Sequence, residues 1–376
     1  MKMTGILLVF ALIIVCLFSF VIVSHAIDAS EATDATFTDV IMNVGKDETE
    51  RNVTWYSNYD TEGEVQYARV DDMTEGEFPA EYSTARARVS ATNENGSYAY
   101  KATLRNLEAD TRYVYRLITG SSVSTLRYFD VKDFDDSFSF IYVSDPQVGS
   151  STYKAAWIDT LDKISESFGE ASFIVSGGDQ ISTSTSEGDY DNFIVDGVSE
   201  IAIAPTNGPG HDNTALYTDH YNLPNLSTTY GVSTATSDYY YTYNNALFVH
   251  LNMDVRTVSE HLTFIENAIK NSPEALWHIV VIHWSFYSGS TESQNATIVS
   301  AAENMVGRMN ELGVDLVLSG HDHFYARSQL VTDYRTVSDD VVVDNTVTNP
   351  KGTLYVCGSS ATGNGITAPV SSEYSA

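Results

Sequence analysis

The chain has 376 residues, with 20 Lys and Arg against 50 Asp and Glu, so its formal net charge is -30. This length allows two domains with a large core, and a hydrophobic content of 43% is that of a globular protein. Such an acidic surface repels nucleic acids and anionic membranes, which excludes both as expected partners. It also disfavours a polyanionic substrate unless metal ions reverse the field at one site.

The N-terminal segment predicts export. Residues 5–23 are almost wholly apolar, with Lys2 before them and Ser24-His25-Ala26 after them. We expect a signal peptide over residues 1–26 and therefore a secreted or cell-surface protein. The same run is long enough to span a bilayer as an uncleaved anchor, and we expect membrane association only in that case. Removal of the peptide leaves Cys357 as the one cysteine, which excludes an intramolecular disulfide.

Residues 37–131 show short alternating runs separated by turn-rich stretches, which predict an all-β sandwich. The stretch from Ala102 to Leu117 resembles the part of fibronectin type III domains in which a Leu, a turn and a Tyr-x-Tyr strand form the tyrosine corner. Trp55 would then be the core tryptophan of an early strand. We interpret this region as a structural spacer module.

Residues 138–376 alternate between apolar runs and helical patterns. Strands are expected at residues 138–144, 172–176, 201–204, 277–282 and 314–318, with a Tyr-rich hairpin over 239–252. Helices are expected at residues 153–168, 190–200, 258–269 and 298–312. The alternation predicts an α/β layered domain, a β-sheet sandwich flanked by helices, with ligands at the strand ends.

Five polar patches recur in order, most of them directly after a predicted strand. They are Ser144-Asp145-Pro146-Gln147, Gly177-Gly178-Asp179-Gln180, Gly210-His211-Asp212-Asn213, Ile282-His283-Trp284 and Gly320-His321-Asp322-His323. Oxygen and imidazole ligands from several strand ends can hold two cations close together. Such a pair of cations is suited to the hydrolysis of phosphate esters.

Each patch alone has a structural explanation. Asp145 precedes a proline, as many turn residues do, and Asp179 after two glycines suits a helix cap. His283 at the end of an apolar strand has the pattern of a core histidine. His321 and His323 differ, because residues two positions apart in a predicted strand point the same way and can address one site.

The ordered series is more specific than any member. At this point the sequence resembles the calcineurin-like metallophosphoesterase superfamily, and within it the purple-acid-phosphatase-like enzymes that carry a fibronectin-type domain ahead of the catalytic one. The resemblance covers about residues 37–360. Its strongest part is Gly320-His-Asp-His-Phe-Tyr-Ala-Arg, close to the family's Gly-His-x-His-x-Tyr-x-Arg. It implies a catalytic domain over residues 138–376. Family members continue with further strands after the one at 353–358, so a chain truncated at its C-terminus is one interpretation.

The resemblance also implies roles for individual residues. The implied metal ligands are Asp145 on the first metal, Asp179 bridging both metals, His323 on the first metal, and His283 and His321 on the second. His211 lies where the family has a non-ligand histidine beside the leaving group, and Asp212 is expected to orient it and keep it protonated.

Three positions depart from the family pattern. Gln147 replaces the usual His or Gly, and its amide either binds a metal weakly or holds a water. Ser182 stands in place of the tyrosine of purple acid phosphatases, which argues against an Fe(III)–tyrosinate site. Gly210 stands in place of the Asn that binds the second metal. Either Asn207 or Asn213 reaches in, or water fills the position, or metal affinity has decayed; we favour Asn207.

The function expected from the resemblance is hydrolysis of a small phosphate ester by hydroxide activated between two divalent ions, with Fe, Mn and Zn as candidates. Two alternatives stay open. One is a phosphodiesterase or nucleotidase of the same superfamily. The other is a non-catalytic surface-binding protein on a decayed phosphoesterase scaffold.

Overall fold

The computed structural model describes residues 34–94, 96–134, 137–290, 295–344 and 346–365. The predicted signal peptide, residues 1–26, lies outside these ranges. Contacts divide the chain into Met1–Ala35 and Thr36–Ala376, and the fold below belongs to the second unit. Within the described ranges, no helix has both the length and the apolar character needed to cross a membrane.

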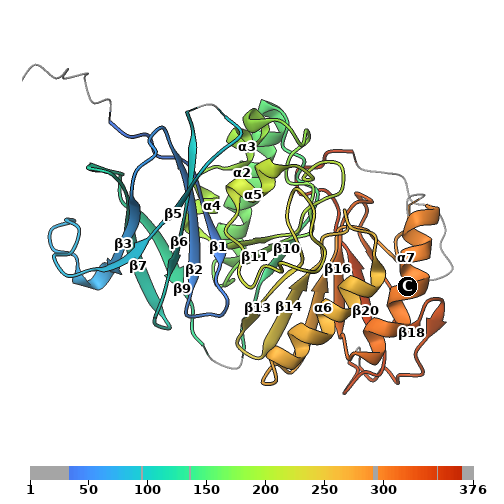
Figure 1. Cartoon of the computed structure of the whole chain (residues 1–376). Helices are drawn as coiled ribbons and strands as arrows, with labels where there is room; N and C mark the ends of the chain where they lie inside the picture. Colours follow the sequence, from blue (N-terminus) through green and yellow to red (C-terminus); the bar gives the residue numbers. More distant parts are fainter. Residues whose placement is uncertain (1–33, 95, 135–136, 291–294, 345, 366–376) are drawn as a thin grey trace, which may run out of the picture. The chain divides into compact units, whose positions relative to one another are not determined.

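The strands form three main sheets and one small one (Figure 1). The first sheet has the order β4 (Ser83–Arg86), β3 (Gly63–Arg69), β7 (Thr111–Thr119), β8 (Ser122–Val123), with β9 (Arg127–Val131) also paired to β7. The second has the order β10 (Ile141–Val143), β11 (Ile174–Ser176), β12 (Ile203–Pro205), β1 (Thr38–Val44), β2 (Arg51–Ser57), β6 (Tyr98–Leu104), β5 (Arg88–Ala91). The third has the order β13 (Tyr239–Tyr243), β14 (Ala246–His250), β15 (Trp277–Val281), β16 (Leu316–Ser319), β20 (Leu354–Cys357), β17 (Ala326–Arg327). The small sheet pairs β18 (Val331–Asp333) with β19 (Thr336–Val337).

The helices lie mainly after residue 150. They are η1 (Val70–Asp72), α2 (Ser151–Phe168), α3 (Glu187–Phe193), α4 (Gly197–Glu200), α5 (Ala215–His220), α6 (Val258–Asn271) and α7 (Ala296–Glu311). The single helix expected over residues 190–200 is wrong, because two short helices flank the β-branched pair Ile194-Val195, which favours an extended backbone. The other expected helices and strands are confirmed to within a few residues.

The N-terminal region is all-β, as expected. Trp55 is fully buried and stacks on Tyr100 with 4.9 Å between ring centroids. The Tyr113 hydroxyl accepts a hydrogen bond from the backbone N–H of Glu108 at 3.0 Å, so a tyrosine ties the turn before its own strand. These contacts make the aromatic side chains the core of this region.

The sheets of the two predicted domains are continuous. Strand β1 pairs in parallel with β12 through Asn43 and Ile203, and the Asn43 side chain donates a hydrogen bond to the Ile203 carbonyl at 3.1 Å. The predicted boundary between residues 131 and 138 therefore separates sequence patterns without separating sheets, and the domain division stays a prediction.

Alternate residues of the parallel strands enter different cores. Phe248 and Val281 face the core between the second and third sheets, whereas Leu247 and Val280 pack with α6 and α7. On the second sheet, Ile174 packs with α2, α3 and α5. The period of two follows from strand geometry and produces the order helices, sheet, sheet, helices. The α/β layered fold class is thus confirmed.

This topology gathers the polar patches. Strands β10, β11 and β12 are parallel, and so are β14, β15 and β16. Each of the five patches follows one of these strands at its carboxyl end, so residues far apart in sequence converge at one edge.

Candidate metal centre

Three predicted ligands meet in a buried cluster. Asp145, Asp179 and His283 each offer one ligand atom, and these atoms lie within 4.8 Å of one another. Asp179 Oδ1 and His283 Nε2 are 3.3 Å apart, which makes them an ion pair when the ring is protonated, and neither has another hydrogen-bond partner among the described residues. Buried polar atoms without partners are costly and uncommon in folded proteins. A cation held between them would satisfy both, so the donor set fits a metal ion.

The backbone around the cluster is strained. Five predicted ligands adopt left-handed φ angles, namely Asp145 (47°), Gln147 (41°), Asp179 (54°), His321 (72°) and His323 (49°). Non-glycine residues seldom adopt this conformation, and those that do concentrate at functional sites. The strained loops turn the side chains back towards the sheet edge.

His321 and His323 reach the cluster in a way that differs from the expectation. They lie in a bend after β16 rather than in a strand, so strand alternation does not aim them. The His321 ring centroid is 5.2 Å from that of His283. His323 Nε2 lies 3.4 Å from Asp145 Oδ1. Two successive left-handed turns bring both rings to the site.

Backbone carbonyls fix the orientation of two imidazoles. His283 Nδ1 lies 2.9 Å from the Gly177 carbonyl oxygen, and His323 Nδ1 lies 2.6 Å from that of Asn364. A carbonyl only accepts, so each Nδ1 carries the hydrogen and each Nε2 is left as the ligand atom. This pairing of a ligand histidine with a backbone acceptor is usual at metal sites.

The carboxylates shift the titration of these groups. Burial opposes the charged form of His283, but Asp179 and Asp145 outweigh it and raise its pKa to about 10. Burial likewise opposes charge on His323, yet Asp145 raises the pKa of this ring. Burial and the neighbouring His283 lower the pKa of His321 to about 4. Burial favours the neutral acid of Asp179, and the adjacent imidazoles nevertheless lower its pKa.

The Gln147 side chain is hydrogen-bonded to two neighbouring side chains. Its side-chain N–H donates to Asp179 Oδ2 at 3.0 Å, and its amide oxygen accepts from Asn364 at 3.2 Å. This arrangement holds the Asp179 carboxylate in place. The metal ligation expected of Gln147 stays a prediction, since an amide oxygen has a second lone pair.

The loop after β12 brings Asn207 and not Asn213 into the interior. Asn207 is buried, whereas Asn213 is exposed. The Asn207 side-chain N–H group donates to Asn252 Oδ1 at 2.8 Å and to Asp254 Oδ2 at 3.1 Å. Gly210 has a φ of 104°, and a Cβ added there would meet nothing within 4 Å. The glycine at the family's Asn position is therefore in an open turn of a reshaped loop.

The side chains of His211 and Asp212 have different hydrogen-bond partners in the structure. The Asp212 carboxylate accepts from the backbone N–H groups of Gly208 and Gln180, at 3.0 and 3.1 Å. His211 Nδ1 instead lies 2.7 Å from the Ser182 carbonyl, and its Nε2 is 3.8 Å from Asp179 Oδ2. The expectation that Asp212 orients His211 is corrected: the acid supports the loop, and a carbonyl orients the ring.

Burial and the Asp179 carboxylate raise the pKa of Asp212 well above its usual range. The His211 side chain is 37% exposed, so an external ligand can reach it.

Sequence reasoning missed several polar residues around the centre. Asn252 and Asp254 directly follow the apolar strand β14, which is the signal that identified the five patches, and they form a sixth. Asn364 follows β20 after a longer interval, and Ser182 contributes its carbonyl to His211 and its hydroxyl to the Gln147 carbonyl. No local pattern distinguishes these last two.

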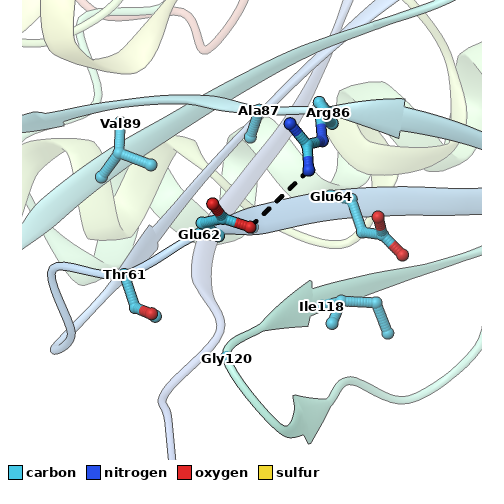
Figure 2. A pocket seen from close by; sticks show the side chains of 9 residues that line it. Thr61, Glu62, Glu64, Arg86, Ala87, Val89, Ile118 and Gly120 are labelled. Atoms are coloured by element: carbon cyan, nitrogen blue, oxygen red, sulfur yellow. Dashed lines mark ion pairs between the residues drawn. The ribbon is translucent and has the colours of Figure 1, made fainter.

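A cleft of about 520 Å³ lies elsewhere, between β3, β7 and the start of β5 (Figure 2). Its polar lining is Thr61, Glu62, Glu64 and Arg86, and Glu62 pairs with Arg86 at 3.8 Å. Both side chains of this pair are highly exposed, so the pair is weak and offers no buried ligand set. The cleft contains none of the predicted site residues.

Comparison with known proteins bears on the fold and on the N-terminal region. Residues 38–134 match the family described as purple acid phosphatase, N-terminal domain. The chain is similar to the purple acid phosphatase PPD1 isolated from yellow lupin (Lupinus luteus) seeds, with a TM-score of 0.68 at 16% identity, over 91% of this chain and 68% of that one. It is also similar to PhoD, with a TM-score of 0.53 at 14% identity, over 86% of this chain and 76% of that one. No curated protein sequence matches it. The chain therefore shares the fold of these two structures over most of its length, and its residues 38–134 match the family of purple acid phosphatase N-terminal domains.

Proposed function

We propose that the protein is a secreted, metal-dependent phosphoric ester hydrolase that acts on small phosphate monoesters. The observation that carries this proposal is the buried cluster of Asp145, Asp179 and His283, in which a carboxylate oxygen and an imidazole nitrogen lie 3.3 Å apart and have no other hydrogen-bond partner among the described residues. The fold shared with a purple acid phosphatase supports the same chemistry.

We assign the metal ligands as follows. Asp145 and His323 would hold a first metal ion, His283, His321 and Asn207 would hold a second, and Asp179 would serve both. Gln147 steadies the bridging carboxylate through its 3.0 Å hydrogen bond. Divalent Fe, Mn or Zn suits a set of carboxylate, amide and imidazole donors.

Two cations bound there would activate a water molecule and neutralise charge on the phosphate oxygens. The chain itself supplies His211, whose exposed ring is held through Nδ1 by the Ser182 carbonyl. This leaves Nε2 facing the site, where a protonated ring can donate to the departing oxygen. The fixed ring orientation reduces the reorganisation needed at the moment of proton transfer.

The test combines metal content with turnover of an aryl phosphate. We expect the purified protein, loaded with Mn, Fe or Zn, to hold close to two equivalents and to hydrolyse the monoester. Asp179→Asn and His323→Ala should each lose both properties. Metal content near zero with no turnover would instead support a non-catalytic scaffold. Faster turnover of a bis-aryl diester than of the monoester would support the phosphodiesterase alternative.

A further inference from the structure

The turn at residues 252–255 carries two buried or half-buried polar side chains that point to Asn207. Asn252 Oδ1 lies 2.8 Å and Asp254 Oδ2 lies 3.1 Å from the same atom, Asn207 Nδ2. Both oxygens accept, so the two hydrogens of the Asn207 amide are taken up by this turn. The amide oxygen is then the atom that Asn207 has left to offer.

The orientation of Asn252 follows from its own partners. Its Nδ2 lies 2.7 Å from the Gly231 carbonyl, 2.9 Å from Ser233 Oγ and 3.1 Å from the Thr236 carbonyl. Two of these groups are carbonyls that only accept, so the nitrogen must face them. The oxygen of Asn252 therefore faces Asn207, and the amide orientations of both residues are determined by the network.

A buried ion pair holds both ends of the turn. Asp238 Oδ1 accepts from the backbone N–H of Asn252 at 2.8 Å, while Asp238 Oδ2 lies 2.8 Å from His261 Nδ1. His261 Nε2 lies 2.8 Å from the Val255 carbonyl. The side chains of Asp238 and His261 are fully buried, so solvent does not compete for these bonds. The His261 imidazole, on α6, thus connects the two ends of the turn: it contacts the Val255 carbonyl directly and Asn252 through Asp238.

We propose that Asn252 and Asp254 are positioning residues that present the Asn207 amide oxygen to the second metal ion, on a turn clamped by Asp238 and His261. This inference rests on the proposed function. It also explains how Gly210 can stand where the family has a metal-binding Asn. In this chain Asn207 would supply the amide oxygen, and the turn after β14 would hold it in place.

The experiment is a double-mutant cycle on metal binding, measured by calorimetric titration of the metal-free protein with Mn²⁺. Asp254→Ala should lower the affinity of one of the two Mn²⁺ equivalents by about tenfold, the usual effect of removing a group that orients a ligand. In the Asn207→Ala background the same change should have an effect of less than about threefold, because a residue that acts through Asn207 has nothing left to position. Asp254→Asn retains an acceptor oxygen and should recover part of the affinity.

Equal losses in both backgrounds would overturn the inference, because they would show that Asp254 acts directly through its charge. Unchanged Mn²⁺ affinity in Asp254→Ala, with normal binding by the wild-type protein, would overturn it as well and leave the proposed function intact. Absence of Mn²⁺ binding by the wild type would overturn the proposed function and this inference with it. Asn252→Ala tests the second positioning residue: it should resemble Asn207→Ala in Mn²⁺ affinity, with near-ultraviolet circular dichroism to establish that the variant is folded.

Discussion

Single residues at the centre divide into ligands and the groups that orient them. His283 and His323 each have one ring nitrogen bound to a backbone carbonyl and the other beside a carboxylate. His211 also has one ring nitrogen bound to a backbone carbonyl, but its side chain is exposed to solvent. The exposed ring is therefore suited to a substrate, and the two buried rings to metal ions.

The role of His211 is separable from metal binding. His211→Ala should lower kcat on an aryl phosphate by about 10²–10⁴-fold, the usual contribution of a general acid, because the variant lacks the proposed proton donor to the departing oxygen. The metal content should stay at the wild-type value. Steady-state kinetics together with elemental analysis measure the two quantities.

The matched control is His278→Ala, which removes a histidine near the other end of the strand that leads to His283. It should leave both kcat and metal content unchanged. A His211→Ala variant that loses its metal would show instead that the ring belongs to the ligand set.

The sequence predicted which side chains gather at the candidate site better than it predicted the groups that orient them. Asp145, Asp179 and His283 follow apolar strands, and parallel strand ends converge in any α/β fold, so their proximity could be predicted. The partner of His211 could not, because Ser182 contributes a carbonyl oxygen that every residue type possesses. The same holds for the Asn364 carbonyl that orients His323.

At the scale of elements, the loops after β11 and β12 pack against each other without space for a side chain. A Cβ added to Gly208 would overlap Asp179 Oδ1 and lie 2.7 Å from its Cγ. The backbone N–H of Gly208 also donates to Asp212. Glycine at this position lets the second loop lie directly on the Asp179 carboxylate.

Gly208→Ala should therefore displace the Asp179 carboxylate. We expect metal affinity to fall by about 10–100-fold, comparable to the loss of a group that orients a ligand. We also expect the free energy of unfolding to fall by about 1–3 kcal/mol, the usual cost of overpacking. Calorimetric metal titration and urea unfolding measure these effects.

Gly188→Ala is the matched control, because the nearest atom to its added Cβ is Ser186 Oγ at 3.8 Å. It lies inside α3 and should stabilise the protein by about 0.5–1 kcal/mol without changing metal affinity. Equal metal affinities in the two variants would contradict the close packing of Gly208 on Asp179.

The pairing of elements shows where local patterns stop being informative. Apolar periodicity predicted most strands and helices because each is set by its own residues. The parallel pairing of β1 with β12 joins residues 160 positions apart, and no local pattern encodes it. The division of the helix expected over 190–200 depends on two adjacent β-branched residues whose effect a periodic pattern does not register.

At the scale of the whole molecule, the net charge of -30 opposes an anionic substrate. At the candidate site, burial opposes charge on His283, but Asp179 and Asp145 raise its pKa to about 10, so this ring offsets part of the carboxylate charge. Burial raises the pKa values of Asp212 and Asp254 and so favours their neutral forms. Divalent ions held at this site would make the local potential positive, and phosphate binding would then be favoured at this one place.

Stability of the whole fold should also depend on pH through a histidine outside the ligand set. His250 ends β14, is fully buried among the layers, and its Nδ1 lies 2.8 Å from Thr206 Oγ1. Burial lowers its pKa to about 3. The unfolded chain binds a proton at this residue near pH 6.5, whereas the native chain does not. The stabilising effect of a neutral His250 is therefore complete above about pH 6.5 and is lost as the pH falls towards 3.

Each pH unit in that range should reduce the free energy of unfolding by about 1.4 kcal/mol for this one group. The wild-type protein should thus lose about 2–3 kcal/mol more than His250→Phe between pH 6.5 and pH 4.5. Phenylalanine keeps the stacking on Tyr239, where the ring centroids are 4.4 Å apart, and removes the titration. Urea unfolding of both proteins at several pH values gives the slope of the free energy of unfolding against pH for each. The contributions of the other titrating groups cancel in the difference between the two slopes. Parallel slopes would show that His250 takes up a proton in the native fold, which would place a proton acceptor or water beside its Nε2.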